Sequence, residues 1–304
     1  MTEFVHVPVL LDSVVDGFDL KSGDNFLDAT LGGGGHAKAL LTKYPKIARY
    51  IGVDQDKDAI AAAKKNLAEF GQVEYEHLNY ADATEKFADV EFGGILADIG
   101  VSSYQIDSAE RGFSFLKDGP LDMRMNKDSD FTAENVVNEY SQTELANVIY
   151  NFGEEKDSRR IATAIVNARK TKRITTTLEL KNIIESVEKK NAASAVQRTF
   201  QAIRIEVNGE LEVLKQFVGK AFGLLRKGGR LAIITFHSLE DRIVKNAFAE
   251  LSRGCICPPS FPVCVCGHKP EGRLVNKKPI VATAEELKQN KRSASAKLRI
   301  IEKL

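Results

Sequence analysis

The sequence is poor in the residues that build cross-linked or extended proteins. Its 304 residues include four cysteines, eight prolines and no tryptophan. The cysteines fall within a dozen residues instead of forming a spread disulfide framework, so we expect a reducing, cytoplasmic setting. No apolar run approaches the roughly 18 residues of a membrane span. Residues 1–20 carry acids and lack a basic start, so we expect no secretory signal there.

The overall composition is that of a globular protein. An apolar fraction of 43% and a charged fraction of 28% exclude disorder, collagen and coiled coil as descriptions of the whole chain. The net charge of +1 hides an asymmetry, because residues 1–150 carry 13 basic and 26 acidic side chains while residues 151–304 carry 30 and 16. A basic half favours a polyanion partner, although an unevenly charged, solvated surface is the alternative.

Short apolar runs alternate with helical patterns over the first hundred residues. This rhythm predicts a parallel, doubly wound α/β sheet. The expected strands are residues 25–28, 49–54, 73–78 and 94–98, and the expected helices are 36–44 and 58–70. After the insertion described next, the pattern predicts a helix at 206–225 that is stopped by Lys227-Gly228-Gly229, then strands at 230–236 and 297–301.

A helical insertion interrupts this pattern. Between 104 and 205 no buried strand is predicted, whereas Ser141-x-x-Glu144 and Thr176-x-x-Glu179 are capping boxes that start helices. Apolar spacing also predicts a helix within 154–169. We therefore divide the chain into a core at 1–103, an insertion for substrate recognition at 104–205 and a second core part at 206–304. The last part contains a Cys- and Pro-rich loop at 254–279.

Three acids and a glycine turn are expected to meet at the carboxyl edge of the sheet. Asp28 precedes the run Gly32 to Gly35, and Asp54 and Asp98 end the second and fourth strands. Strand ends of a parallel sheet line the ligand crevice, glycines allow close backbone approach, and an acid about 20 residues after the glycines can hold a ribose. The alternatives are a flexible turn and simple helix caps.

The acids favour a cationic ligand over a dinucleotide. A carboxylate four residues before the first glycine would repel a pyrophosphate. S-adenosylmethionine has no phosphate and carries a sulfonium and an ammonium group, which Asp28 and Asp98 attract by Coulomb's law. The residues alone therefore favour a methyl donor as cofactor.

Polar residues follow two of the expected strands. Ser102 and Gln105 come after Asp98, and His237, Ser238 and Asp241 come after the strand at 230–236. The hydroxyl, imidazole and carboxylate groups among them are candidates to position an acceptor amine, with Asp98 first and Ser102, His237 and Asp241 as weaker candidates. They do not form a hydrolase triad, because the chain lacks a G-x-S-x-G nucleophile elbow.

Other segments are candidates for substrate contact. Phe113 and Phe115 would stack on an extruded base or would fill the core under their loop, and Arg124 lies in the same Gly-rich stretch. Basic residues that suit RNA phosphates gather in the insertion, and further ones follow at 288–299. The four that we assign to phosphate contacts are Arg169, Lys170, Lys172 and Arg173.

The four cysteines have the ligand count of a zinc site. Cys255-x-Cys257 and Cys264-x-Cys266 are spaced more tightly than the usual C-x-x-C pairs. Reduced loop thiols without a metal are the alternative, and we assign no metal to the chain at this stage.

Taken together, seven segments in this order closely resemble the MraW (RsmH) family of bacterial small-subunit rRNA cytosine N4-methyltransferases. The resemblance extends from about residue 5 to residue 301 and is far more specific than the glycine turn alone. The matching segments are residues 6–11, 28–36, 98–105, 109–115, 118–125, 198–204 and 236–245.

The resemblance implies a fold, a reaction and a set of contacts. The fold is a Rossmann-like class I S-adenosylmethionine-dependent methyltransferase domain with an inserted helical domain. The reaction is methyl transfer to the N4 amine of a cytosine near the ribosomal P site, within an assembled small subunit. Family variation makes the Cys-rich loop non-catalytic and Gly33 non-essential. The implied cofactor contacts are Gly34, Gly35, His36, Asp54, Tyr80, Asp98 and Gln105.

Two other functions remain open at this point. A nicotinamide-dependent dehydrogenase would use the same glycine turn, and an inactive RNA-binding assembly factor would keep the fold without the reaction. The sequence leaves open whether the chain forms a homodimer.

Overall fold

The computed structural model describes residues 8–255, 257–258, 261, 263 and 265–304. The chain divides into two compact units, which are described separately. Unit 1 consists of residues 1–100 and 211–304, and unit 2 consists of residues 101–210. The insertion predicted from the sequence, residues 104–205, differs from unit 2 by three residues at its start and five at its end. No helix in the described ranges is long and apolar enough to cross a membrane.

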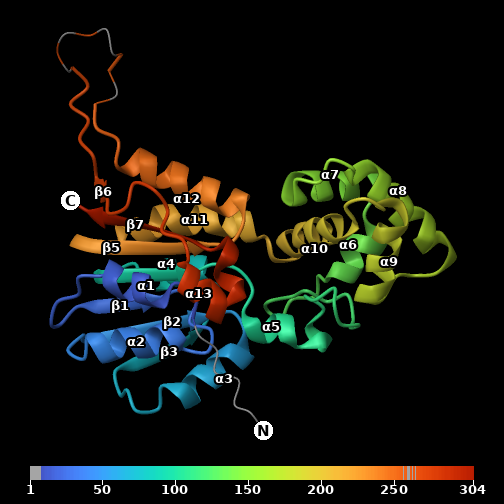
Figure 1. The fold of residues 1–304 in the computed structure, drawn as a ribbon. Coiled ribbons are helices and arrows are strands. Elements are labelled where there is room, and N and C mark those ends of the chain that lie inside the picture. Colours follow the sequence, from blue (N-terminus) through green and yellow to red (C-terminus); the bar gives the residue numbers. More distant parts are fainter. Residues whose placement is uncertain (1–7, 256, 259–260, 262, 264) are drawn as a thin grey trace. The chain divides into compact units, whose positions relative to one another are not determined.

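Unit 1 is built around a seven-stranded sheet (Figure 1). Its order is β3-β2-β1-β4-β5-β7-β6, with β1 to β5 parallel and β7 antiparallel to both of its neighbours. This arrangement extends the doubly wound 3-2-1-4-5 order and confirms the Rossmann-like class that the sequence predicts. The strands are β1 (Asn25–Asp28), β2 (Arg49–Asp54), β3 (Val73–His77), β4 (Phe92–Asp98), β5 (Leu225–Thr235), β6 (Gly272–Leu274) and β7 (Lys297–Lys303).

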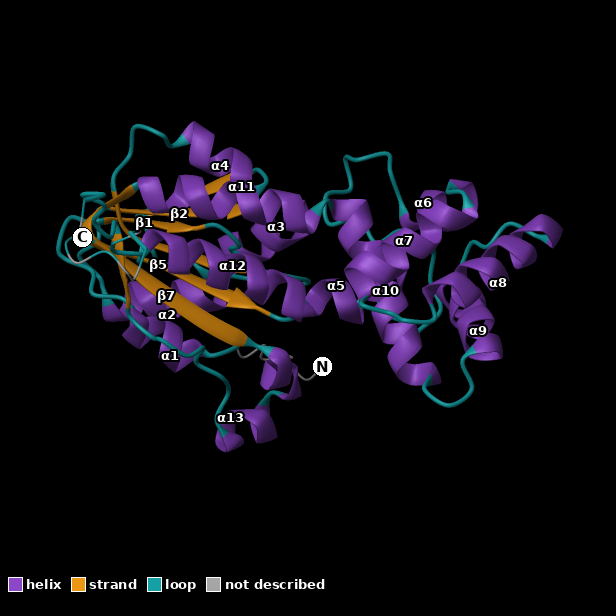
Figure 2. Ribbon diagram, turned by 90° about the horizontal axis from the view of Figure 1, so that it is seen from above, coloured by secondary structure: helices purple, strands orange, loops and turns teal. Residues whose placement is uncertain are grey.

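Helices cover both faces of this sheet (Figure 2). Buried strand residues alternate between the faces, so that Phe26 packs on one side and Leu27 on the other. One face packs against α4 (Tyr80–Lys86), α11 (Glu210–Gly223) and α12 (Ser238–Leu251). The other face packs against α1 (Leu11–Gly17), α2 (Gly35–Lys43) and α3 (Lys57–Asn66). Near the C-terminus lie α13 (Ala284–Gln289) and the 3-10 turn Lys291–Ser295.

The region around β5 differs from the sequence prediction. The expected helix at 206–225 is two helices, because Gly209 takes a left-handed conformation (φ 59°) that ends one before α11 begins. Lys227-Gly228-Gly229 is not a helix stop. It lies inside β5, where the pairing with β4 shifts register between Phe92 and Gly94, as in a β-bulge. The short strand β6 was not predicted.

Unit 2 is helical with its own apolar core. Its only described β contact is an isolated bridge between Pro120 and Thr176, which confirms that the insertion carries no strand there. Both predicted capping boxes form, at the starts of α7 and α9. Its helices are α5 (Ser103–Asp107), α6 (Ala133–Glu139), α7 (Gln142–Gly153), α8 (Ser158–Thr171), α9 (Thr177–Val187) and α10 (Ala192–Asn208), with a 3-10 turn at Ala109–Arg111.

Candidate functional site

The glycine turn joins β1 to α2 and is held by its neighbours in the sheet. The Leu31 N–H donates to the Val53 carbonyl (2.8 Å), and the Gly32 N–H donates to Asp54 Oδ2 (2.8 Å). Gly34 then takes a left-handed conformation (φ 82°) as the N-cap of α2. The turn is therefore fixed to the carboxyl end of β2 before any ligand is considered.

Packing within the chain explains two of the four glycines. A Cβ on Gly34 would lie 2.9 Å from the Leu67 side chain, and a Cβ on Gly35 would lie 2.4 Å from the Pro8 ring. Gly33 is different, because its nearest neighbour would be 3.9 Å away. Gly34 and Gly35 are thus required by the turn itself, and the structure offers no steric reason for glycine at position 33.

Asp54 closes the turn with both carboxylate oxygens. Oδ2 accepts from Gly32 and Oδ1 accepts from the Asp56 N–H at 2.8 Å. Burial raises the pKa of Asp54 to about 6, although these two backbone hydrogen bonds oppose the shift. Each oxygen keeps a second lone pair, so Asp54 remains able to accept hydroxyl groups from a ligand at the strand edge.

Asp28 is positioned as expected at the end of β1 but is enclosed. Its side chain is 1% exposed, and it accepts a hydrogen bond from the Tyr50 hydroxyl at 2.7 Å. Burial raises its pKa to about 7, against the effect of that hydrogen bond. Because so little of Asp28 is exposed, we do not expect it to contact a ligand directly. Its charge acts on the site by raising the pKa of Asp98.

Asp98, at the end of β4, has the most unusual environment of the three acids. Its side chain keeps 25% of its surface exposed, and the buried Oδ1 atom has no hydrogen-bond partner within the described part of the chain. Burial first, then the nearby acids Asp28 and Glu240, raise the pKa of Asp98 to about 8. An uncompensated, partly accessible carboxyl group is typical of a ligand-binding or catalytic position.

His36 lies beside Asp98 in the first turn of α2. Its Nε2 atom lies 2.9 Å from the Val9 carbonyl oxygen, an acceptor, so Nε2 carries the proton. Its Nδ1 atom lies 3.8 Å from Asp98 Oδ2, which is beyond hydrogen-bond distance. The ring is 7% exposed, so His36 forms a wall of the Asp98 environment.

Tyr80 begins α4 after β3. Its ring is 8% exposed and packs edge-on against Phe217, with centroids 5.1 Å apart. Its place after a strand end agrees with the expected position, but most of the ring belongs to the core.

Two residues after β5 cap the next helix. His237 is the N-cap of α12, and the fully buried Glu240 accepts from the Phe236 N–H (2.8 Å) and the His237 N–H (3.3 Å) in a capping box. The His237 Nε2 atom lies 3.0 Å from Glu240 Oε1. The sequence analysis did not single out Glu240, because a capping box normally starts with serine or threonine.

Asp241 does not fit the expected role of an acceptor at the strand ends. It faces β7, where its carboxylate accepts from Arg299 (2.7 and 3.2 Å) and lies 3.5 Å from the Lys297 Nζ atom. Burial would raise its pKa, but the Arg299 hydrogen bonds and charge outweigh this and hold the pKa below its ordinary value. A carboxylate in such a pair joins a helix to a strand.

The remaining candidates belong to unit 2. Ser102 and Gln105 form the capping box of α5, in which each side chain accepts from the other residue's N–H, at 3.2 and 3.0 Å. Phe113 is 9% exposed and Phe115 packs edge-on against Phe200, and both belong to the apolar core of the unit. The structure therefore supports packing of the two rings in the core rather than an exposed surface for stacking on a base.

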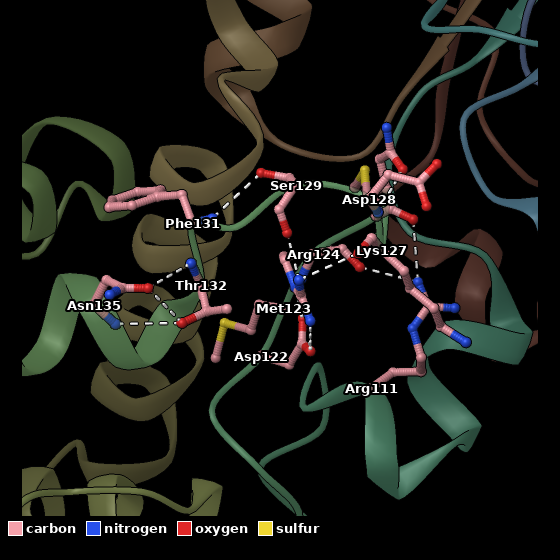
Figure 3. A network of polar contacts seen from close by, with 12 residues as sticks. Arg111, Asp122, Met123, Arg124, Lys127, Asp128, Ser129, Phe131, Thr132 and Asn135 are labelled. Atoms are coloured by element: carbon pink, nitrogen blue, oxygen red, sulfur yellow. Dashed lines mark hydrogen bonds and ion pairs between the residues drawn. The ribbon is translucent and has the colours of Figure 1, made fainter.

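Arg124 holds a loop together (Figure 3). It forms a bidentate pair with Asp122 at 2.8 and 2.7 Å and also donates to the Lys127 and Ser129 carbonyls. Buried Arg111 donates to the carbonyl of Arg124 at 2.9 Å. Arg124 thus has its donors largely occupied by the loop.

The four predicted phosphate contacts also have partners within unit 2. Arg169 donates to two backbone carbonyls, Lys170 to Asn167, Lys172 to Glu179, and Arg173 to both Glu134 and Glu139. Phosphate binding by Lys172 or Arg173 would have to replace an ion pair that already exists.

The whole chain matches a known family. The MraW methylase family matches residues 3–304. The chain is 48% identical over 99% of its length to the whole of "Ribosomal RNA small subunit methyltransferase H" of Clostridium botulinum strain Loch Maree, and 46% identical over the same share to 99% of the protein of that name of Finegoldia magna. The chain belongs to the MraW methylase family, which confirms the resemblance read from its motifs.

A solved structure shows a weaker likeness. An rRNA methylase from Streptococcus thermophilus aligns with 97% of the chain and 93% of its own length at 9% identity, with a TM-score of 0.43.

The contrast between Gly34 and Gly33 is testable. Gly34→Ala should lower the free energy of unfolding by about 1–3 kcal/mol, because it combines a left-handed backbone with a close contact to Leu67. Gly33→Ala is the matched control and should change it by less than about 0.5 kcal/mol. Urea denaturation of both variants measures the difference, and equal losses would contradict the packing argument.

Proposed function

We propose that the chain transfers a methyl group from S-adenosylmethionine to the N4 amine of a cytosine in small-subunit rRNA. The observation that carries the proposal is Asp98, whose carboxyl group lies at the end of β4 with one oxygen unpaired and the pKa raised. Membership of the MraW methylase family supports methyl transfer, and the names of the relatives support small-subunit rRNA as substrate. Neither finding supports a nicotinamide-dependent dehydrogenase.

The strand edge fits a cationic methyl donor. Asp28, Asp54 and Asp98 end neighbouring strands, and all three have raised pKa values, so each gains from a nearby positive charge. S-adenosylmethionine supplies an activated methyl group on a positively charged sulfur. Asp54 would accept its ribose hydroxyls, and Asp98 would lie against its charged end. The fixed turn at Gly34 and Gly35 would lie along the molecule.

Asp98 is also the group that we assign to the acceptor amine. The exposed part of its carboxyl group can accept an N–H from N4, which directs the nitrogen lone pair toward the methyl group. The nitrogen forms its new bond to carbon as the bond from carbon to sulfur breaks, and the amine then loses one proton. No strong base is needed for this step, so orientation is the main contribution of the chain. His237 is a second candidate for positioning the base because it lies just after the end of β5, although its Nε2 atom also contacts Glu240 at 3.0 Å.

We assign RNA contact in unit 2 to exposed cations that hold no partner in the described part of the chain. Arg160 donates to the Val187 carbonyl and pairs with Glu188 at 3.1 Å, which brings the start of α8 to the end of α9. Four exposed cations flank this junction and lack the ion pairs that occupy Lys172 and Arg173. They are Lys156, Arg159, Lys189 and Lys190.

The raised pKa of Asp98 predicts a pH-dependent affinity for the cofactor. Below about pH 8 the group is protonated and neutral, so binding a cation requires loss of that proton. The affinity for S-adenosylmethionine should therefore rise with pH, by up to about tenfold per unit below pH 8, and level off above it. Calorimetric titration from pH 6 to 9 measures this.

Asp98→Asn is the matched control for that titration. The variant keeps the shape of the side chain but not the charge, so its affinity should change less with pH. The remaining pH dependence would come from ionisation of the ligand and titration of Asp28 and Asp54. Asp28, Glu240 and His36 surround the carboxyl group, and none of them is changed. If the two profiles had the same slope, Asp98 would not be the titrating group.

Transfer of labelled methyl to small ribosomal subunits tests the reaction itself. Subunits from a strain that lacks the protein should gain about one methyl group per particle on a cytosine N4, which mass spectrometry of the rRNA locates. Subunits that already carry the modification should gain none. Asp98→Asn should lower turnover by about 10²-fold or more, as expected for loss of a group that orients the acceptor. Binding of subunits without incorporation would instead support an assembly factor.

The RNA assignment predicts a contrast between two double variants of equal charge change. Lys189→Ala with Lys190→Ala should weaken subunit binding and lower the salt dependence of log K by about 1–2. Lys172→Ala with Arg173→Ala should mainly destabilise unit 2, because it removes pairs with Glu179, Glu134 and Glu139. Filter binding at several salt concentrations compares them, and a larger salt effect in the second variant would reverse the assignment.

A further inference from the structure

The described residues of the segment that joins α12 to β6 form no apolar core. Among its described residues between 252 and 271 none is buried, and Phe261, Val263 and Val265 are 51%, 71% and 74% exposed. Figure 1 shows it extending away from the sheet of unit 1. Its base is closed by the Glu271 N–H, which donates to the Leu251 carbonyl at 2.9 Å. Hydrophobic burial of its described residues therefore does not order this segment, and small elements without a core are usually held by a disulfide or a metal.

Three thiols gather inside this segment. The Sγ atoms of Cys255, Cys257 and Cys266 all lie within 4.8 Å of one another. Cys255 and Cys257 come from the first arm of the segment and Cys266 from the second, so the cluster joins the two arms. Cys264, the fourth cysteine of the sequence motif, lies outside the described residues.

The spacing of the sulfur atoms suits a tetrahedral metal better than a disulfide. Sulfur atoms each about 2.3 Å from a tetrahedral zinc ion are about 3.8 Å apart. The Cys255 and Cys266 Sγ atoms are 3.8 Å apart. A disulfide would require them to approach to about 2.05 Å and would leave Cys257 without a role.

Backbone amides donate hydrogen bonds to two of the sulfur atoms. The Cys257 N–H lies 3.4 Å from Cys255 Sγ, and the Val265 N–H lies 3.3 Å from Cys257 Sγ. In metal sites, such hydrogen bonds to the sulfur atoms orient the ligands. They come from both arms, so the loop backbone is already arranged around the cluster.

We propose that Cys255, Cys257 and Cys266 bind a structural zinc ion that folds this segment. Thiolates select zinc, copper(I) or iron–sulfur clusters among common metals. Zinc is redox-inert, and the three described thiolates would fill three of its four tetrahedral positions. The ion would link the two arms, and its binding free energy would stabilise the folded arrangement of the segment. The site is separate from the strand-end acids and has no part in methyl transfer.

Metal content tests the proposal directly. The full chain, purified with a thiol-free reductant and without added metal, should contain about one zinc ion per chain, as measured by elemental mass spectrometry. Replacement by Co²⁺ should give intense sulfur-to-cobalt absorption in the near ultraviolet. Cys255→Ser with Cys266→Ser should reduce bound zinc below about 0.1 per chain and remove that absorption, since one remaining described thiolate cannot hold the ion.

Val263→Ser is the matched control, because it changes an exposed side chain of the same segment and removes no thiol. It should keep the metal. Absence of zinc and of cobalt absorption in the unmodified chain would overturn the proposal. So would equal metal content in the double cysteine variant, or a Cys255–Cys266 disulfide formed while reductant is present.

Hydrogen exchange of the unmodified chain gives a second measurement that depends on no variant. Removing zinc with a chelator should speed exchange of the Cys257 and Val265 amides at least tenfold, because their acceptors lose their fixed positions. Exchange in β4 and β5 should not change. Unchanged exchange at the two loop amides after metal removal would overturn the assignment of these sulfur atoms as ligands.

Discussion

Negative charge crowded at one edge of a parallel sheet is the constraint on which the rest of the site depends. The strand alignment brings Asp28, Asp54 and Asp98 to the same edge, where burial disfavours ionisation of each. The chain treats them differently. Asp54 is compensated by two backbone amides and Asp28 by the Tyr50 hydroxyl. Asp98 keeps an oxygen without a partner in the described part of the chain. Asp98 is therefore the least compensated of the three acids, and its side chain is still 25% exposed.

Much of the fold could be predicted because local patterns agree with the tertiary structure. Strands β1, β2 and β4 contain short apolar runs bounded by turn signals, and the capping boxes at Ser141 and Thr176 start helices as their chemistry requires. The failures are places where pairing across the sheet decides the outcome. Lys227-Gly228-Gly229 has the composition of a helix stop. In the structure it lies within β5, at the bulge where the pairing with β4 shifts register. The three residues of β6 carry too little pattern to be recognised without β7 beside them.

Side-chain roles were predicted less well than side-chain positions. The sequence placed Asp54 and Asp98 at strand ends, because that depends only on strand boundaries. It could not show that Asp241 pairs with Arg299, 58 residues away, or that Arg173 is engaged by acids on another helix. Ion pairs between residues far apart in the sequence cannot be recognised from local patterns. A cluster of cations therefore has the same sequence pattern whether its side chains face solvent or acidic partners. The buried role of Glu240 was hidden for a related reason, because a histidine replaced the usual first residue of its cap.

The division of unit 1 by unit 2 has a consequence for synthesis on the ribosome. The edge of β4 is completed by β5, whose first residue, Leu225, lies 127 positions after Asp98. During elongation the first four strands therefore exist with β4 as an open edge while the whole of unit 2 emerges. Unit 2 is helical, and its consecutive helices α7, α8 and α9 pack on one another, which favours rapid folding. Its early folding would bring the two parts of the sheet within reach of one another and shorten the time for which a buried, apolar strand is exposed to pairing with other chains.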